Sequence, residues 1–173
     1  MKSFVVDTNV AVVASRRSPQ AGPACVLACV DVLEQIAKSG RIVLDDKSRI
    51  LDEYMRNLSL SGQPGLGDAF FKWVWQNQAN TARCERVVIH PKPGLEEDYT
   101  EFPADAELRR FDRSDRKFVA VAMGSRYATE ILNAVDRHWW DYRISLERYG
   151  LRITFLCPGQ FGEDRSSAYS PRS

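Results

Sequence analysis

Short apolar segments suited to buried strands alternate with longer amphipathic segments along most of this chain. The strand-like segments are 3–6, 41–44, 86–90, 128–135 and 151–156. The segments with apolar residues at helical spacing are 23–38, 47–60, 66–78, 114–126 and 137–149. Strands that alternate with helices in this way are typical of a parallel sheet with helices on both faces. We therefore predict an α/β protein, a three-layer α/β/α sandwich around a mostly parallel central sheet.

This pattern covers residues 1–158 and fits a single domain, because a chain of 173 residues can bury one substantial core. The segment 159–173 is polar and contains Gly, Ser and Pro, so we expect a flexible C-terminal tail there. The segment 91–105 carries three prolines and several acids, which predicts a surface loop.

The charge of the chain is nearly balanced, with 24 Lys and Arg against 23 Asp and Glu. This balance gives no overall attraction to nucleic acid or to a membrane surface, although local patches can still bind. No apolar run approaches the roughly 18 residues that suggest a membrane span. Polar residues come too soon after the start for the core of a signal peptide. We therefore expect a cytoplasmic protein with no membrane partner.

The chain has four cysteines, Cys25, Cys29, Cys84 and Cys157. Zinc sites usually show closely spaced pairs of Cys or His, and only two histidines are present. Cys25 and Cys29 lie four residues apart in an apolar helical segment, where small buried thiols are common. We interpret the cysteines as core residues.

Two acids directly follow strand-like segments. Asp7 follows the first predicted strand, and Asp136 follows the fourth. The carboxyl ends of parallel strands meet at one edge of a sheet, and ligands of α/β proteins bind there. Asp45 and Asp46 also follow a strand, but they stand where a helix needs an N-cap, and capping explains them.

Two further acids lie on helix-like segments. Asp115 is three, four and seven residues before apolar residues of its segment, which places it on the sheet-facing side of the first turn. Glu53 lies at the border of the apolar stripe of 47–60. The alternative for Asp115 is N-terminal helix charge or a capping box with Asp112, and the alternative for Glu53 is an ordinary solvated residue.

The candidate metal site consists of four acids, Asp7, Glu53, Asp115 and Asp136. Several carboxylates at close range repel one another and raise each other's pKa unless a cation lies among them. Oxygen ligands without a set of Cys and His favour Mg²⁺ or Mn²⁺. Such a site is suited to phosphodiester hydrolysis, in which a metal activates water and stabilises the charge that develops on phosphate.

The motifs around these acids resemble those of the PIN-domain nucleases, a family that includes the toxin ribonucleases of bacterial toxin–antitoxin pairs. VVDTNV (Val5–Val10) is similar to the family's opening motif, a hydrophobic residue followed by Asp, Thr or Ser, and Asn or Ser. The resemblance implies that Asp7 is a metal ligand and that Thr8 and Asn9 shape the site or hydrogen-bond within it.

Three later motifs continue the resemblance, which spans roughly residues 3–157. Glu53 matches the family's single Glu on the helix after the second strand. DRKFVAVA (Asp115–Ala122) is similar to the family's Asp-led helix with small residues that pack on the sheet. ILNAVDRHWWDY (Ile131–Tyr142) carries Asp136 where the family has an acid after a strand.

Two positions stay open at this point, because Asp141 competes with Asp136 and Asp112 competes with Asp115. The family often has an amide or hydroxyl directly before its last acid, whereas two apolar residues separate Asn133 from Asp136 here. The fourth ligand is therefore the least defined of the set.

The resemblance implies a Mg²⁺- or Mn²⁺-dependent endoribonuclease that is the toxin of a toxin–antitoxin pair, with an RNA substrate, an antitoxin partner and a homodimeric state. Arg113, Arg116 and Lys117 lie beside the third acid and suit phosphate contacts, although a solvated helix surface explains them equally well. The alternative function is a catalytically weak or inactive PIN-like module that binds RNA or protein. A phosphatase with an aspartyl nucleophile would need a second Asp two residues after the first, where Asn9 stands.

Overall fold

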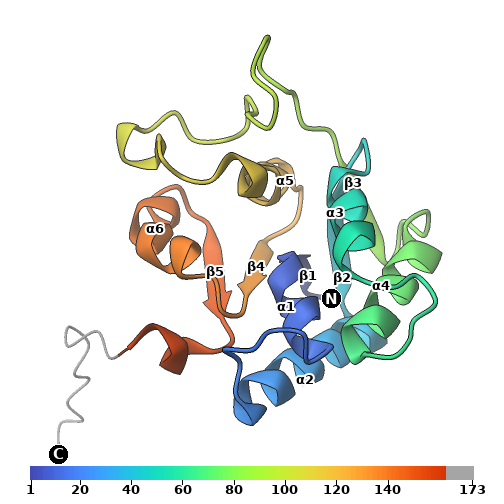
Figure 1. The fold of residues 1–173 in the computed structure, drawn as a ribbon. Helices are drawn as coiled ribbons and strands as arrows, with labels where there is room; N and C mark the ends of the chain where they lie inside the picture. The colour runs from blue at the N-terminus through green and yellow to red at the C-terminus, as the bar shows by residue number, and fades with distance from the viewer. Residues whose placement is uncertain (163–173) are drawn as a thin grey trace, which may run out of the picture.

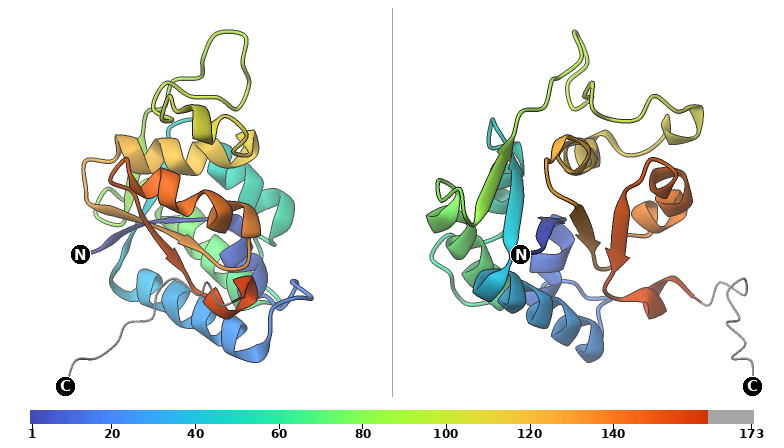
Figure 2. Two further views of the ribbon diagram at one scale, coloured as in Figure 1. Left: turned by 90° about the vertical axis from the view of Figure 1, so that its left-hand side faces the viewer. Right: turned by 180° about the vertical axis from the view of Figure 1, so that it is seen from behind.

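The computed structural model describes residues 1–162 and shows an α/β protein with a five-stranded parallel sheet, in the order β3-β2-β1-β4-β5. The strands are β1 (Ser3–Val6), β2 (Arg41–Asp45), β3 (Cys84–Val87), β4 (Thr129–Asn133) and β5 (Arg152–Phe155). The α-helices of the described part are α1 (Thr8–Ala14), α2 (Pro23–Ser39), α3 (Arg49–Asn57), α4 (Leu66–Asn77), α5 (Arg116–Gly124) and α6 (Arg137–Glu147). Helix α2 covers one face of the sheet and α5 the opposite face (Figure 1 and Figure 2), which confirms the predicted three-layer sandwich.

The central strand β1 fixes the edge of the sheet where the candidate acids lie. Val5 and Val6 are fully buried, as expected for a parallel strand covered on both faces. Val6 lies opposite Leu132 of β4, and the backbone N–H of Asp7 donates to the Leu132 carbonyl at 3.0 Å. The chain therefore leaves β1 and β4 at the same level. The strand order also reverses between these two strands, which is where ligand sites of open α/β sheets form.

Helix α1 begins directly after β1 and is absent from the predicted elements. Its valines favour a strand by intrinsic propensity. Asp7 nevertheless caps the helix, because its Oδ1 accepts from the backbone N–H of Asn9 at 2.9 Å. Val10 and Val13 are buried, and α1 packs against α2 and α4. Tertiary burial therefore decides the conformation of this segment.

The prediction of strand 86–90 is wrong in its position along the chain. β3 pairs with β2 from Ile42 opposite Cys84 to Asp45 opposite Val87. Because β2 ends at Asp45, residues after Val87 have no strand partner, and Val88 is 58% exposed. The other predicted strands and helices are present with bounds that differ by a few residues. Helix α5 starts later than predicted because a 3₁₀ turn, η2 (Arg113–Asp115), precedes it.

The segment 91–105 is a loop, as predicted, and buried groups hold it to the domain beside α5 (Figure 1). Tyr99 and Phe102 are buried. The carboxylate of Asp98 pairs with the guanidinium of Arg116 at 3.0 Å and with Lys92 at 3.4 Å. These contacts therefore hold the loop in place against the N-terminal end of α5.

All four cysteines are buried core residues, as predicted, and a disulfide that was not predicted joins Cys25 at the start of α2 to Cys157 after β5. Cys29 and Cys84 are free and buried. The bonded cysteines are 132 residues apart in the sequence, and only the folded chain brings them together.

The segment predicted to be a flexible tail starts with ordered residues. Pro158–Phe161 forms the 3₁₀ helix η3, and Phe161 is buried with its ring stacked 4.8 Å from that of Trp140. The remainder of the predicted tail, 163–173, lies outside the described residues.

Candidate metal centre

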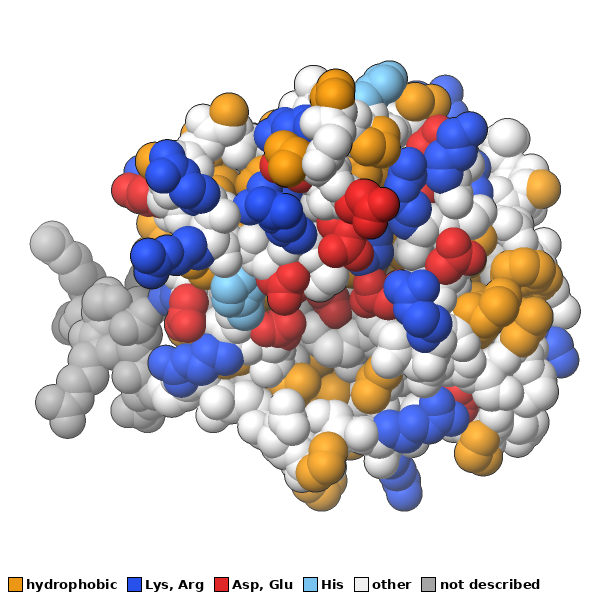
Figure 3. Space-filling view, turned by 45° about the horizontal axis from the view of Figure 1, so that its top comes forward, with side chains coloured by type: hydrophobic (Ala, Val, Ile, Leu, Met, Phe, Trp, Pro, Cys, Tyr) orange, Lys and Arg blue, Asp and Glu red, His pale blue; other side chains and the backbone are white. Residues whose placement is uncertain are grey.

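The four predicted acids converge at the carboxyl ends of β1 and β4. Asp7 follows β1, Asp136 follows β4, Asp115 directly precedes α5, and Glu53 lies in α3. Figure 3 shows acidic side chains gathered around a hollow, with Lys and Arg side chains on its rim. The negative charges of Asp115, Glu53 and Asp136 all act on the carboxyl group of Asp7. The fold therefore brings together acids that are more than a hundred residues apart.

Asp7 is the most deeply buried of these acids, with 4% of its surface exposed. Its Oδ1 accepts hydrogen bonds from the backbone N–H of Asn9 at 2.9 Å and from the Asn9 side chain at 2.7 Å. Its Oδ2 is buried and has no hydrogen-bond partner among residues 1–162. Burial, followed by the charge of Asp115, raises the pKa of Asp7 well above its usual range. A buried carboxylate oxygen without a partner is costly, and a cation is the partner that would satisfy it.

Asn9 connects the two strand ends through hydrogen bonds at both ends of its side-chain amide. Its Nδ2 donates to Asp7, while its Oδ1 accepts from the backbone N–H of Ala134 at 2.7 Å. Both ends of the Asn9 amide are therefore used, and the orientation of the Asp7 carboxylate is fixed relative to the chain that leaves β4.

Glu53 is held by two short contacts. Its Oε1 accepts from the Thr8 hydroxyl at 2.5 Å, and its Oε2 lies 2.5 Å from the Lys117 ammonium. The neighbouring Tyr54 donates its hydroxyl to the Val6 carbonyl at 2.5 Å, which fixes α3 against the end of β1. Thr8 is thus a supporting residue, and Glu53 has a fixed position with both oxygen atoms engaged.

Lys117 is buried inside the site, with 5% of its surface exposed, and it also donates to the Ser114 carbonyl. Its prediction as a substrate-binding residue does not match this position, because its ammonium faces Glu53. A buried ammonium needs paired carboxylates, and a cluster of carboxylates needs positive charge. Lys117 therefore offsets one negative charge of the cluster.

Asp115 carries the second strongly shifted carboxyl group. Burial raises its pKa from 3.8 to about 7, and the charges of Asp136, Asp112 and Glu53 add to the shift, whereas the charge of Lys117 opposes it. This carboxyl group is therefore poised between its neutral and charged forms near neutral pH in the metal-free protein.

The structure distinguishes the competing acids by their surroundings. Asp136 caps α6 through the backbone N–H of His138 at 2.8 Å, and its charge acts on both Asp7 and Asp115. The side chain of Asp141 is 54% exposed and pairs with Arg137 at 3.6 Å. Asp136 is therefore the acid that belongs to the cluster.

Asp112 has a separate role one turn before Asp115. Its Oδ1 accepts from the backbone N–H and the hydroxyl of Ser114, both at 2.9 Å, so it caps η2. The first of these hydrogen bonds lowers its pKa below the usual range. Asp112 thus contributes negative charge at the rim of the cluster, and Asp115 lies inside.

The predicted role of Arg116 in substrate binding is contradicted by its burial. Its surface is 6% exposed, and its guanidinium donates to the carbonyls of Phe111 and Arg109 and pairs with Asp98. It also lies over the ring of Phe102, 4.5 Å from the centroid. Arg116 therefore joins the 91–105 loop to α5. Among the three predicted basic residues only Arg113 is exposed.

A shallow cavity of about 350 Å³ next to Lys117 contains basic residues that are absent from the predicted site. Arg49 and Arg56 of α3 line it together with Lys117, and three acids line it as well, Asp52, Glu96 and Glu97. Arg49 pairs with Asp45 at 3.2 Å, whereas Arg56 forms no ion pair within the described residues. Arg49, Glu53 and Arg56 stand at positions i, i+4 and i+7 of one helix, and this spacing is the signal that would have revealed them.

Asn133 is a second residue that the predicted site lacks. It is fully buried at the end of β4, its Oδ1 accepts from the backbone N–H of Asp136 at 3.2 Å, and its Nδ2 has no partner within the described residues. An amide within an otherwise apolar strand end is the sequence signal for it. Asn133 positions the turn that carries Asp136.

The residues present fit a hard divalent cation. The acids offer only oxygen ligands, as Mg²⁺ and Mn²⁺ prefer, and the unpartnered Oδ2 of Asp7 lies among them. No three of these acids bring one oxygen each within 4.8 Å of one another in the described part of the chain. Carboxylates without a cation between them repel, so cation binding requires side-chain rotations towards the ion.

Comparison with protein-family models, with curated proteins and with solved structures found no match to this chain. No helix of the described residues is long and apolar enough to cross a membrane.

Proposed function

We propose that this protein is a Mg²⁺- or Mn²⁺-dependent endoribonuclease of the PIN-domain type. The observation that supports this most directly is the buried, unpartnered Oδ2 of Asp7 beside three further carboxylates, at the point where the strand order of a parallel sheet reverses. Burying several carboxylates close together has a high electrostatic cost unless a cation is bound among them. Acids placed together in this way are therefore typical of a metal site.

Asp7, Asp115 and Asp136 would hold the cation, with Glu53 at its side. When bound, such an ion lowers the pKa of a water molecule and stabilises the charge that develops on a phosphodiester. Asn9 keeps the Asp7 carboxylate in one orientation. These residues therefore supply a set of oxygen ligands at the edge of the sheet.

Lys117 brings a basic group into the site. Its pairing with Glu53 holds that carboxylate in place. Arg49 and Arg56 of α3 line the cavity next to Lys117, and Arg56 forms no ion pair within the described residues. Basic residues bind the phosphate groups of a nucleic acid strand, because neutralising the phosphates releases the counterions that surround the strand. We propose that an RNA strand passes over this cavity next to the acids.

The biological setting proposed here is that of a cytoplasmic toxin of a toxin–antitoxin pair, acting as a homodimer with an antitoxin partner. A short reading frame for a small DNA-binding protein next to this gene would support the pairing. Sedimentation of the purified chain measures its oligomeric state.

The direct test is cleavage of a labelled single-stranded RNA in the presence of Mn²⁺ by the wild type, Asp7→Asn and Asp31→Asn. Asp31 is an exposed residue of α2 and serves as the matched control. We expect cleavage by the wild type and the control, inhibition by a chelator, and a loss of at least about 100-fold for Asp7→Asn, because charge stabilisation by a metal is worth several kcal/mol.

Equal cleavage by the wild type and Asp7→Asn would refute the assignment, as would activity that resists the chelator. If RNA binds but calorimetry detects no Mn²⁺ binding, the inactive RNA-binding module is the correct alternative.

A further inference from the structure

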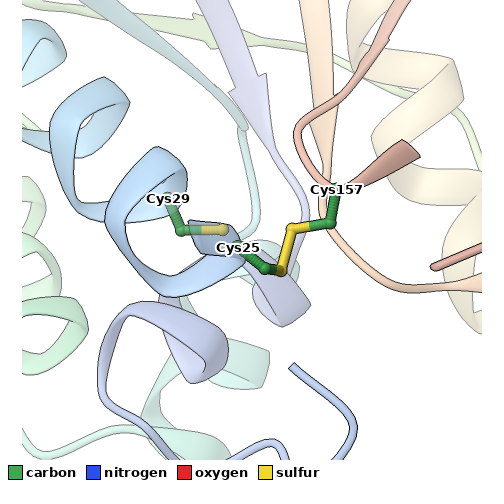
Figure 4. Close-up of side chains that lie close together, drawn as sticks. All are labelled: Cys25, Cys29 and Cys157. Atoms are coloured by element: carbon green, nitrogen blue, oxygen red, sulfur yellow. A yellow bond between two sulfur atoms is a disulfide. The ribbon is translucent and has the colours of Figure 1, made fainter. Parts of the chain in front are cut away.

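Three sulfur atoms lie close together where the start of α2 meets the chain that follows β5 (Figure 4). Cys25 is in the first turn of α2, Cys29 follows one turn later on the same helix face, and Cys157 comes after β5. The Sγ atoms all lie within 4.8 Å of one another, and the three residues are buried. Cys25 and Cys157 form the disulfide, and Cys29 remains a free thiol beside it.

We propose that reduction of this disulfide by a dithiol creates a three-sulfur site for a soft monovalent cation of the Cu⁺ type. The dithiol supplies two electrons and two protons. The Cys25–Cys157 bond breaks, both sulfurs become thiols, and the dithiol becomes a cyclic disulfide. Each thiol that then binds the cation releases its proton to water. The site does not depend on the nuclease proposal.

The dimensions of the cluster match such a cation. A metal bonded in a plane to three sulfurs at about 2.3 Å sets the sulfurs about 4 Å apart. The observed separations are below 4.8 Å, so once the disulfide is open only small side-chain movements are needed. Residues 25 and 29 are one helical turn apart, which makes two of the ligands neighbours before any long-range contact is considered.

The ligand chemistry selects the class of cation. Thiolates favour soft ions such as Cu⁺ over Mg²⁺ or Mn²⁺. Structural zinc sites use four protein ligands, and no fourth Cys, His, Asp or Glu of residues 1–162 joins this group. Three-coordinate binding is therefore the geometry that the described residues offer.

Burial raises the pKa of the Cys29 thiol to about 12. In the oxidised protein Cys29 is therefore a neutral thiol and a weak nucleophile towards the adjacent disulfide.

The test uses the full chain, reduced with a dithiol and then freed of reductant without oxygen. Cu⁺ is titrated against a chromogenic Cu⁺ chelator for the wild type, Cys29→Ser and Cys84→Ser. Cys84 is the matched control, since it is a free buried cysteine of β3 outside the cluster. We expect one Cu⁺ per chain in the wild type and in Cys84→Ser, and affinity reduced at least tenfold in Cys29→Ser.

Far-ultraviolet circular dichroism checks that the variants are folded, and Cys29→Ala replaces Cys29→Ser if the hydroxyl prevents folding. The oxidised protein should not compete with the chelator. The proposal is overturned if the reduced wild type does not bind Cu⁺ in competition with the chelator, or if the Cys29 variant binds as tightly as the Cys84 variant. Cu⁺ binding that persists in Asp7→Asn keeps this result separate from the nuclease assignment.

Discussion

The substitution Asp115→Asn should stabilise the metal-free protein at neutral and alkaline pH. The folded state raises the pKa of Asp115 from 3.8 to about 7, mainly through burial and then through the charges of Asp136, Asp112 and Glu53. An ionised Asp115 is therefore unfavourable in the folded chain. Asn has nearly the same shape and carries no charge.

The magnitude follows from the two pKa values. Below pH 4 the carboxyl group is protonated in both the folded and the unfolded chain, so it has no effect. Between about pH 4 and pH 7 the folded chain holds one more proton, and the free energy of unfolding falls by about 1.4 kcal/mol per pH unit. Above pH 7 the loss is complete at about 4 kcal/mol. The advantage of Asp115→Asn is thus about 2 kcal/mol at pH 5 and about 4 kcal/mol at pH 8.

Urea denaturation with a chelator present, followed by tryptophan fluorescence at pH 5 and pH 8, measures this difference. Asp141→Asn is the control, because Asp141 is exposed and pairs only with Arg137 in the described structure. Its effect should be small and equal at both pH values. An Asp115→Asn advantage that does not grow with pH, or a destabilised variant at pH 8, would refute the reasoning.

Adding Mn²⁺ then separates the electrostatic argument from the metal proposal. A ligand at 100 times its Kd stabilises the folded state by about 3 kcal/mol. The wild type should gain this stability, and Asp115→Asn should gain little, so the difference at pH 8 narrows. An equal gain in both proteins would show that Asp115 does not hold the ion.

Three other perturbations have defined outcomes. Lys117→Met should destabilise the metal-free protein by about 3–5 kcal/mol, because it leaves Glu53 without its buried partner. In a thermal melt, Mn²⁺ should restore part of this loss. An unchanged melting temperature would contradict the assigned role of Lys117. Arg116→Met should also lower the free energy of unfolding by several kcal/mol, because it removes the buried partner of Asp98. Limited proteolysis should then show earlier cleavage within 91–105. A loop that stays protected from the protease would contradict the anchoring role of Arg116. Reduction by a dithiol should lower the free energy of unfolding by up to about 5 kcal/mol, since the disulfide closes a loop of 132 residues. The stability of Cys157→Ala should not change with the same dithiol. An equal response of both proteins would contradict the assignment of the disulfide.

The sequence contains enough local information for the fold class and for the most important acid. The spacing of apolar residues within short segments predicts the buried strands and the amphipathic helices. The alternation of these strands and helices along the chain implies a parallel sheet. Asp7 and Asp136 could be placed at one edge because Asp7 directly follows β1 and Asp136 comes three residues after the end of β4. Helix α1 was missed, since local propensity and tertiary burial disagree over its valines.

The choice between competing residues depended on contacts that no local pattern records. Asp136 and Asp141 lie on the same short stretch, and only the packing of α6 leaves one beside Asp7 and the other exposed. Arg116 and Lys117 look equally available in the sequence. The fold buries both, one against the 91–105 loop and the other against Glu53.

The sequence by itself determined a parallel α/β chain whose strands end in carboxylates. The tertiary structure decided how those carboxylates are compensated, because the deciding pairs are far apart in the chain. Thr8 meets Glu53 across 45 residues, Asn9 meets Ala134 across 125, and Cys25 meets Cys157 across 132. Periodicity is a short-range property, whereas the pairing of buried charges and sulfurs is set by which strand ends and helices the complete fold places side by side.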